Sequence, residues 1–203
     1  DEDHGIDAQL PLTSEQMKVL ISLIKASITD SDQHNPALIL IKVILIRRYM
    51  SPELYDLMES LMKLVVRSPK ALLRQECARL FVRYLLDYPM GEGRFEQHLK
   101  QVVANISYEY QEGRLSGINL LSLVIEKLPQ ELLLRNAQHV FLPLVLQLVN
   151  DDSKDCRAEV SKCIMSLLKR SSTELLQTFQ DYCLRWSSQT GPLRLASLQV
   201  LGL

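Results

Sequence analysis

Four short segments of this 203-residue chain share one pattern, and that pattern constrains the fold more than any other feature. Each segment opens with an arginine, at Arg74, Arg114, Arg157 and Arg194. The intervals between these arginines are 40, 43 and 37 residues. A small or modest residue follows three positions later, at Cys77, Gly117, Val160 and Ser197, and we expect it to let neighbouring Arg-bearing helices approach each other. A large apolar residue follows seven positions later, at Phe81, Leu121, Ile164 and Leu201. A repeat of this length predicts a stack of similar two-element units.

Helical spacing of apolar residues, with few glycines and prolines between, predicts that both elements of each unit are helices. The clearest unit runs from Phe141 to Arg157, where a leucine-rich stretch with a proline leads into an aspartate-rich turn and then an arginine. This order of residues resembles the HEAT pattern, whose period is about 40–47 residues. We therefore predict an all-α fold, an α-solenoid of antiparallel helix pairs of HEAT or armadillo type, with about five pairs and no strand.

Helix start signals recur along the chain. Thr13 and Gln16 fit a capping box, as do Ser171 and Glu174. Asn35-Pro36, Ser51-Pro52 and Ser68-Pro69 each place a capping residue before proline. Gly91-Glu92-Gly93 is the expected loop tip. The predicted later helices cover residues 71–88, 95–111, 114–128, 131–149, 154–169, 173–187 and 192 onward.

Charge divides the chain unevenly. Residues 1–35 carry seven acidic and two basic side chains, whereas the total net charge is −1. We expect residues 1–12 to form a flexible acidic segment, and residues 13–203 to form the repeat array. The chain opens without methionine and stops inside an apolar run, so we expect it to be a fragment of a longer solenoid. The weak charge of the body does not match the basic footprint of a dedicated nucleic-acid domain.

Groups that carry catalytic or metal chemistry are scattered. The four cysteines form no C-x-x-C pair and fall in apolar patterns, which predicts buried free thiols in a reducing compartment. The four histidines are far apart, and His139 beside an apolar run is expected to be partly buried. The sequence therefore predicts no enzyme activity, no catalytic residue, no metal ligand, no cofactor and no small-molecule substrate. Its most apolar run, residues 37–46, is too short to span a membrane.

The surface offers one candidate binding region. Five positions after the leading arginines lie Arg79, Asn119, Lys162 and Gln199. These side chains are expected to face outward. Arg79, Arg83 and Lys162 are predicted to form a basic ridge that contacts RNA phosphates or an acidic partner segment. The alternative is a solvated face with local ion pairs, such as Glu76 with Arg79. The four repeat arginines are expected to be structural, reaching aspartates and carbonyls of an adjacent turn. Tyr182 and Trp186 are expected to pack into the solenoid, with base stacking as the alternative.

Several stretches resemble a known family. They are Pro52-Glu-Leu-Tyr-Asp-Leu-Met58, Tyr84-Leu-Leu-Asp-Tyr-Pro-Met-Gly91, Tyr108-Glu-Tyr-Gln-Glu-Gly-Arg114 and Pro143-Leu-Val-Leu-Gln-Leu-Val-Asn-Asp-Asp-Ser153. Together they resemble the DRIM family of very large nuclear proteins, also called small-subunit processome component 20. The resemblance implies a long helical solenoid that acts in the nucleolus, in early small-subunit ribosome assembly, within a pre-ribosomal ribonucleoprotein particle. It implies no catalytic residue.

Two functions remain open at this stage. The first is a non-catalytic scaffold that grips protein partners in a pre-ribosomal particle and acts in ribosomal RNA processing, with contact to RNA backbone as a secondary role. The second is a HEAT-repeat transport or signalling adaptor that binds partner peptides. Neither reading involves a membrane.

Overall fold

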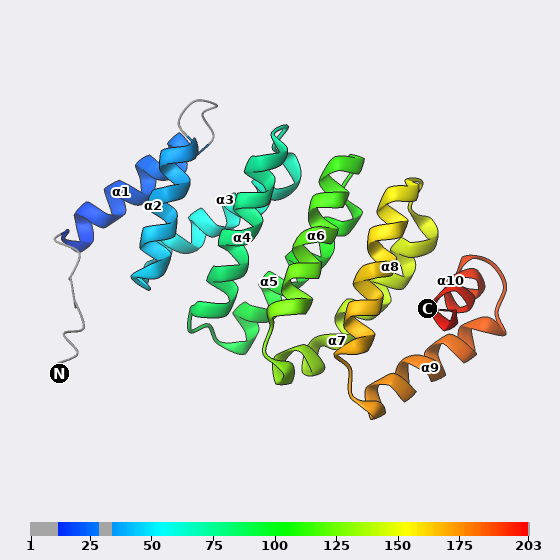
Figure 1. Ribbon diagram of the computed structural model, residues 1–203. Coiled ribbons are helices and arrows are strands. Elements are labelled where there is room, and N and C mark those ends of the chain that lie inside the picture. Colours follow the sequence, from blue (N-terminus) through cyan, green and yellow to red (C-terminus); the bar gives the residue numbers. More distant parts are fainter. Residues whose placement is uncertain (1–11, 29–33, 203) are drawn as a thin grey trace, which may run out of the picture. The chain divides into compact units, whose positions relative to one another are not determined.

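The computed structural model describes residues 12–28 and 34–202, and every regular element in these ranges is helical (Figure 1). The all-α prediction is therefore confirmed for the described residues. They divide into two compact units, with the boundary between Ser60 and Leu61. The predicted acidic segment, residues 1–12, lies almost wholly outside the described residues.

The first unit contains α1 (Ser14–Ser27), α2 (His34–Ile46) and the start of α3 (Pro52–Arg67). Thr13 and Gln16 form the predicted capping box, in which the Gln16 backbone N–H donates to Thr13 Oγ1 at 3.3 Å and the Thr13 N–H donates to Gln16 Oε1 at 2.8 Å. Ser51 caps α3 as predicted, since its Oγ accepts from the Leu54 N–H at 3.2 Å. The prediction for Asn35 is wrong, because α2 already includes His34 and Asn35 lies inside it.

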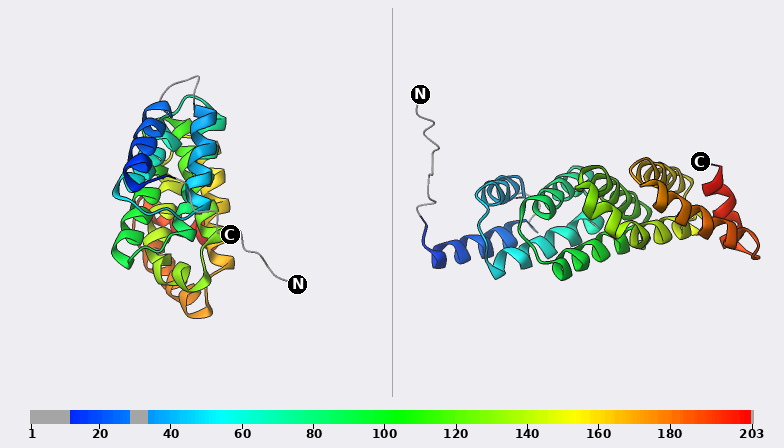
Figure 2. Two further views of the ribbon diagram at one scale, coloured as in Figure 1. Left: turned by 90° about the vertical axis from the view of Figure 1, so that its left-hand side faces the viewer. Right: turned by 90° about the horizontal axis from the view of Figure 1, so that it is seen from below.

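The second unit holds the rest of α3 and the helices that carry the Arg-led segments. Its complete helices are α4 (Ala71–Asp87), α5 (Glu92–Ala104), the 3₁₀ turn η1 (Asn105–Ser107), α6 (Gln111–Lys127), α7 (Gln130–Asn150), α8 (Lys154–Lys169), α9 (Thr173–Ser187) and α10 (Pro192–Leu201). From α4 to α8 the direction of successive helices alternates (Figure 1). Helices α4, α6 and α8 form one layer, and α5 and α7 form the other (Figure 2).

The helices that carry the repeated Arg-led segments pack against one another in sequence order. Helix α6 contacts α4 on one side and α8 on the other, and each of these three helices carries one Arg-led segment. The side chains three positions after the arginines are all buried, as predicted. Phe81, Leu121 and Ile164, seven positions after the arginines, are buried as well. Leu201 is exposed, because it is the last residue of α10, on the open side of the last pair, α9 and α10.

One of the small repeat residues has a different neighbour from the expected one. A Cβ added to Gly117 would lie 2.5 Å from the carbonyl oxygen of Asn105, so glycine lets α6 approach η1. We expected the small residue to let neighbouring Arg-bearing helices approach each other. At Gly117 that expectation is wrong, because the close contact is with the turn that precedes α6.

Both predicted ends of α5 and two predicted helix caps are also wrong. Helix α5 begins at Glu92, so Gly91 is its N-cap and Gly93 lies in its first turn rather than at a loop tip. The predicted helix 95–111 ends at Ala104 and continues as η1. Ser172, not Ser171, caps α9, accepting from the Leu175 N–H at 3.3 Å. Ser68 accepts from the Lys70 N–H at 3.2 Å within the loop before α4, which starts at Ala71.

Helix α7 is the long core helix of the second unit. Among the described residues it is the one helix long and apolar enough to cross a membrane by length and composition. It packs against α8 and α10, and one of its faces is buried. The apolar character of α7 is thus explained by its place in the helical stack.

Candidate partner-binding surface

The Arg-led segments place a guanidinium at the start of each helix in the α4–α6–α8 layer. Arg74 in the first turn of α4 is buried, and its Nη1 donates to the carbonyls of Ser68 at 2.8 Å and Pro69 at 3.3 Å. Its Nε donates to Ser116 Oγ on α6 at 2.8 Å. The guanidinium therefore satisfies carbonyls of its own preceding loop and links α4 to α6.

Arg114 makes the same kind of contact one repeat later. Its Nη1 donates to the carbonyl of Glu109 at 3.0 Å, and its Nε and Nη2 donate to the two carboxylate oxygens of Asp151 at 2.9 Å and 3.0 Å. Asp152 also accepts from Nη2. Arg157, at the start of α8, donates to the main-chain carbonyls of Asp151 at 2.6 Å and Asp152 at 3.1 Å. The turn between α7 and α8 is thus held from both sides.

Asp151 is the anionic centre of this arrangement. Burial alone would raise the pKa of its carboxyl, but hydrogen bonds from Arg114, from the Ser153 N–H and from Gln147 outweigh burial and hold the pKa below its ordinary value. The Ser153 N–H lies 2.8 Å from Oδ1, and Gln147 Nε2 lies 2.6 Å from Oδ2. Every lone-pair direction of this carboxylate is used inside the protein, so it is not a ligand for an outside group.

Arg194 differs from the other three arginines. It is exposed on α10, and within residues 12–28 and 34–202 its side chain has no hydrogen bond or ion pair. Three of the four repeat arginines thus make contacts of the predicted kind. A structural role shared by all four stays a prediction.

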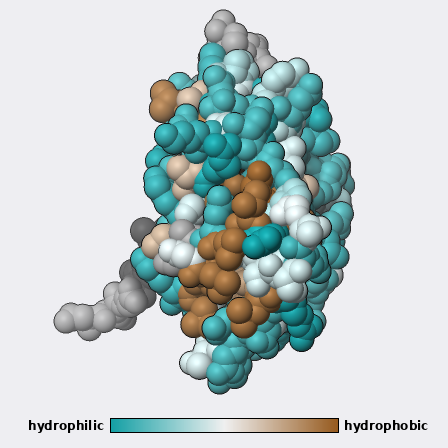
Figure 3. Space-filling model, turned by 90° about the vertical axis from the view of Figure 1, so that its right-hand side faces the viewer, coloured by the Kyte–Doolittle hydropathy of each residue, from teal (hydrophilic) through white to brown (hydrophobic). Residues whose placement is uncertain are grey.

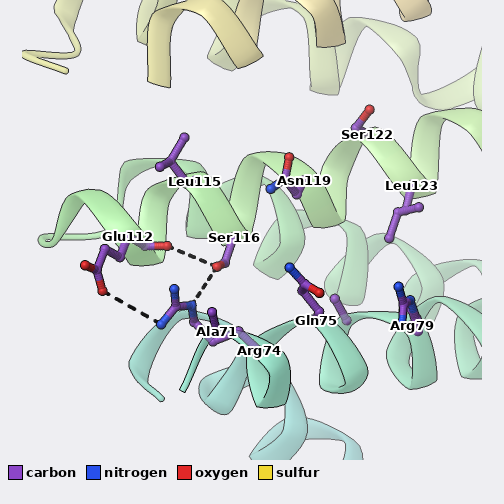
Figure 4. Close-up of a pocket in the computed structure, with 11 residues that line it drawn as sticks. Ala71, Arg74, Gln75, Arg79, Glu112, Leu115, Ser116, Asn119, Ser122 and Leu123 are labelled. Atoms are coloured by element: carbon purple, nitrogen blue, oxygen red, sulfur yellow. Dashed lines mark hydrogen bonds and ion pairs between the residues drawn. The ribbon is translucent and has the colours of Figure 1, made fainter. Parts of the chain in front are cut away.

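A groove lies between α4 and α6, beside the Arg74 contact. Its volume is about 480 Å³. It is lined by Ala71, Arg74, Gln75, Ala78, Arg79, Glu112, Leu115, Ser116, Asn119, Ser122 and Leu123. Gln75 and Arg79 extend from α4 toward α6, and Leu123 of α6 points toward α4 (Figure 4). Arg74, Ser116 and Glu112 close one end, with Arg74 Nη1 3.9 Å from the Glu112 carboxylate.

Two exposed amides line this groove, one from each helix. Gln75 on α4 and Asn119 on α6 are exposed, and across the described parts of the chain neither side chain has a hydrogen-bond partner. Each amide offers both a donor and an acceptor. Asn119 is one of the outward-facing repeat positions noted in the sequence, whereas Gln75 was missed. Only the pairing of α4 with α6, which a period count cannot supply, brings the two amides together.

The predicted basic ridge is distributed over two helices. Arg79 and Arg83 lie on α4, whereas Lys162 lies on α8, with α6 between the two helices. Each cation has an acidic neighbour on its own helix: Arg79 pairs with Glu76, Arg83 Nε lies 3.2 Å from Asp87, and Lys162 Nζ lies 2.6 Å from Glu159. Arg79 also lines the α4–α6 groove. Binding by this ridge stays a prediction.

Arg170 is a structural residue that the sequence pattern did not reveal. It follows α8 and donates to the carbonyls of Ile125 and Leu128 at the end of α6, the second at 2.7 Å. Gln130 in turn donates to the Arg170 carbonyl. A cation at a helix C-terminus satisfies its free carbonyls and complements its dipole. Because Arg170 falls outside the repeated segments, no internal comparison could have identified it.

Aromatic and sulfur-containing side chains support the core. Phe179 on α9 stacks on Phe141 of α7 with 3.9 Å between ring centroids, and Trp186 stacks on Tyr182 at 5.8 Å. The aromatic face of α9 therefore packs into the array as predicted. All four cysteines are free and buried, which confirms the predicted burial of free thiols. His139 is exposed, so the expectation of partial burial is wrong. The described residues contain no cluster of His, Cys, Asp or Glu suited to a metal ion.

An apolar patch covers the end of the array formed by α9 and α10 (Figure 3). The exposed leucines of these helices are Leu176, Leu184, Leu195, Leu198 and Leu201. On α10 the three leucines follow one another at intervals of three residues, so they lie along one side of the helix. This end presents apolar surface, in contrast to the polar α4–α6 groove.

Comparison with known proteins gives two distant relatives. No family model matches the chain. U3 small nucleolar RNA-associated protein 20 of Schizosaccharomyces pombe is 28% identical over 169 residues, which are 83% of this chain and 7% of the relative. The protein of the same name from Saccharomyces cerevisiae is 29% identical over 149 residues, which are 73% of this chain and 6% of the relative. These matches confirm the resemblance to the DRIM family, and the chain is a distant homologue of a short segment of U3 small nucleolar RNA-associated protein 20.

Proposed function

We propose that the chain is a non-catalytic scaffold segment that binds protein partners during early small ribosomal subunit assembly and ribosomal RNA processing. It acts in the nucleolus, inside a pre-ribosomal ribonucleoprotein particle. The single observation that carries this proposal is the distant homology over 83% of the chain to a protein named for its association with the U3 small nucleolar RNA. The chain covers less than a tenth of that relative, so the proposal concerns one segment of a large protein.

The structure supports a scaffold in a second way. Stacked helix pairs form an elongated surface rather than a closed pocket for a small substrate, which suits them to holding partners. The arginines of the α4–α6–α8 layer are engaged in holding the stack, as described above for Arg74 and Arg114. The exposed cations Arg79 and Lys162 have acidic neighbours, so contact with RNA backbone is secondary in this proposal.

The test is affinity purification of the endogenous protein, tagged in living cells, with each sample divided into nuclease-treated and untreated halves. Mass spectrometry and RNA sequencing then identify what is bound. We expect U3 small nucleolar RNA, precursor ribosomal RNA and small-subunit assembly proteins, and we expect the proteins to remain after nuclease treatment. An untagged strain is the matched control.

The alternative function is a transport or signalling adaptor that captures partner peptides. The feature that favours it is the polar groove between α4 and α6, which is open to a peptide in either role. Recovery of transport cargo or signalling proteins without ribosomal precursors in the same purification would replace the assembly role by this one.

A further inference from the structure

Helix α2 follows the same register as α4 and α6, although His34 stands where the later segments have their arginine. Its buried residues are Ala37, Ile41, Ile44 and Leu45. Forty positions later, α4 buries Cys77, Phe81, Tyr84 and Leu85, and another forty positions later α6 buries Gly117, Leu121, Val124 and Ile125. This register identifies the side chains of α2 that point away from the packed helices.

The outward side of α2 is apolar. Ile39, Val43 and Ile46 are 64%, 40% and 51% exposed, and their spacing of four and then three residues places them in one row, the α2 stripe. The side chains at the corresponding positions of α4, α6 and α8 are mostly polar: Arg79, Asn119 and Lys162, then Arg83, Leu123 and Ser166, then Leu86, Glu126 and Lys169. Packing within the repeat therefore does not require apolar side chains at these positions.

Cations border the α2 stripe on both sides. At about 100° per residue, Lys42 lies about 60° to one side of Ile39 and Arg47 about 80° to the other. The Arg47 N–H donates to the Val43 carbonyl at 3.0 Å, so Arg47 continues the last turn of α2. No acidic residue occurs from residue 34 to residue 52. Across the described residues Lys42 makes no ion pair, so its charge is available to an acidic partner.

From the α2 stripe and its cationic borders we propose that α2 binds an amphipathic helix of a partner protein, whose apolar row covers the stripe and whose acidic side chains lie along both edges. The inference rests on the proposed scaffold function and specifies the kind of partner that one surface holds. The stripe spans seven residues from Ile39 to Ile46, or about 10 Å at 1.5 Å per residue, so it covers roughly two turns of the partner helix.

The surface of α2 favours a helix over an extended segment. The main-chain groups of α2 are paired within the helix, so the stripe offers an occupant only side-chain contacts. An extended segment would lose water from its own N–H and C=O groups without replacement, which is costly. A helix satisfies its own main chain and packs a row of side chains against another helix.

The arrangement of charge and apolar surface also separates this occupant from others. A nucleic-acid backbone needs cations in front of its phosphates, whereas the centre of the α2 stripe is apolar and its cations stand at the edges. A lipid surface is flat and broad, whereas the stripe is a single row of side chains on one short helix that is packed against α1. One acidic amphipathic helix matches both the width of the row and the charge of its borders.

The experiment compares four forms of the intact 203-residue chain: wild type, the stripe variant Ile39→Gln/Val43→Gln, the charge variant Lys42→Glu, and the control Leu195→Gln/Leu198→Gln. The control removes two similarly exposed apolar side chains from α10. Circular dichroism melts check folding, which we expect to be unchanged because all five side chains are exposed. The probe is a phage-displayed library of helical peptides with one fixed apolar row, whose edge positions vary among glutamate, lysine and glutamine, selected on the wild type.

We expect peptides with glutamates at both edges to be enriched, and to bind wild type and control equally. The stripe variant should bind them about ten-fold or more weakly, because two apolar contacts are lost. The charge variant should bind them about three-fold or more weakly, because an attraction becomes a repulsion, and added salt should reduce this difference. Replacing the glutamates of one edge by lysines should restore binding to the charge variant.

Three results would overturn the inference: no enrichment of glutamate at the edges, equal binding to wild type and the stripe variant, and an equal loss in the control. Binding of phosphatidylserine vesicles that the stripe variant alone loses would assign the stripe to a lipid surface instead. Binding of the peptides only to a chain that lacks residues 1–11 would assign it to the acidic end of this same chain. If U3 RNA still purifies with the endogenous protein while the peptide test fails, only this inference falls and the proposed function stands.

Discussion

Arg114 on α6 and Asp151 at the end of α7 form a two-pronged ion pair, with Nε–Oδ2 at 2.9 Å and Nη2–Oδ1 at 3.0 Å. The Asp151 side chain is fully buried, and that of Arg114 is 11% exposed. Planar guanidinium and carboxylate groups match each other in this geometry, which fixes the distance and angle between neighbouring helix pairs.

Substituting Asp151→Asn should destabilise the fold by about 2–4 kcal/mol at pH 7, since it removes a buried charge from its partners. The matched control is Asp152→Asn, whose side chain also contacts Arg114 but is 88% exposed and should cost less than about 1 kcal/mol. Denaturant unfolding of the two variants measures the difference. Similar losses in both would show that burial of the Asp151 pair does not matter.

The same pair gives the stability a pH dependence. The pKa of Asp151 is lowered in the folded chain from its ordinary value of 3.8, because the hydrogen bonds from Arg114, Ser153 and Gln147 outweigh the opposing effect of burial. The stabilisation is therefore complete above the ordinary pKa and is lost as the pH falls through the folded one. The gap between wild type and Asp151→Asn should be constant from pH 5 to 7 and narrow below about pH 4. A gap that stays constant at low pH would contradict this.

Gly117→Ala should destabilise the chain by about 1–3 kcal/mol, because the new Cβ would lie 2.5 Å from the Asn105 carbonyl oxygen. This cost exceeds the gain of under about 1 kcal/mol from replacing glycine in a helix. Gly93→Ala in the first turn of α5 is the control, since nothing lies within 4 Å of its added Cβ. We expect the control to be neutral or slightly stabilising in thermal melts.

Ile164→Asp should unfold the array, because Ile164 is completely buried and an unpaired carboxylate there costs several kcal/mol. Leu121→Asp should behave in the same way for the same reason. Arg79→Glu, on the exposed side of α4, should leave the fold intact and change stability by less than about 1 kcal/mol. Far-ultraviolet circular dichroism separates these outcomes, and equal loss in all three would refute the division into inner and outer positions.

The cysteines should be unreactive while the chain is folded. Burial raises the pKa of both Cys77 and Cys163 to about 12, and the nearby acids Glu76, Glu126 and Glu159 add to the effect. Since the thiolate is the nucleophile, a thiol reagent at pH 8 should label these two only after unfolding. Mass spectrometry with and without denaturant measures the labelling. Rapid labelling of the native chain would show that this core opens readily.

The apolar end should make the isolated chain self-associate. Leu195 and Leu198 are 60% and 52% exposed on α10, beside further exposed leucines of α9. Contiguous apolar surface of this kind promotes association in water. Leu195→Glu/Leu198→Glu should lower the apparent mass in sedimentation experiments without changing the melting temperature, whereas Leu72→Glu, at an isolated exposed leucine of α4, should change neither.

Much of the fold was predictable because the same helix caps and apolar stripes recur from one repeat unit to the next. The bounds of α8 and α9 match the predicted ranges, since each helix starts after a serine cap and its apolar stripe runs without interruption. The 3₁₀ turn η1 was missed because Val102 and Ile106 keep helical spacing through it. At this point Asn105 of η1 lies against Gly117 of α6, a contact that the spacing of apolar residues does not reveal.

The candidate site was much less predictable. Asn119 stands out in the repeat register, but Gln75 has no special place in it, and the groove exists because Ala71 and Ala78 face α6. The side chains that contact each other across neighbouring helices lie about 40 positions apart in the sequence, so local patterns do not reveal them. The same limit applies to Arg170, whose role depends on the carbonyls at the end of the helix two elements earlier.

The turn at Asp151 has a mechanical consequence. Its carboxylate holds Arg114 of the preceding helix pair, and its main-chain carbonyl holds Arg157 of its own pair. A pull along the stack is therefore borne at this joint by charged hydrogen bonds, which resist shear better than sliding apolar side chains do. At α10 the corresponding Arg194 makes no such link within the described residues. Under load we expect the stack to yield first at the α9–α10 pair and to keep the α6–α8 joint closed longest.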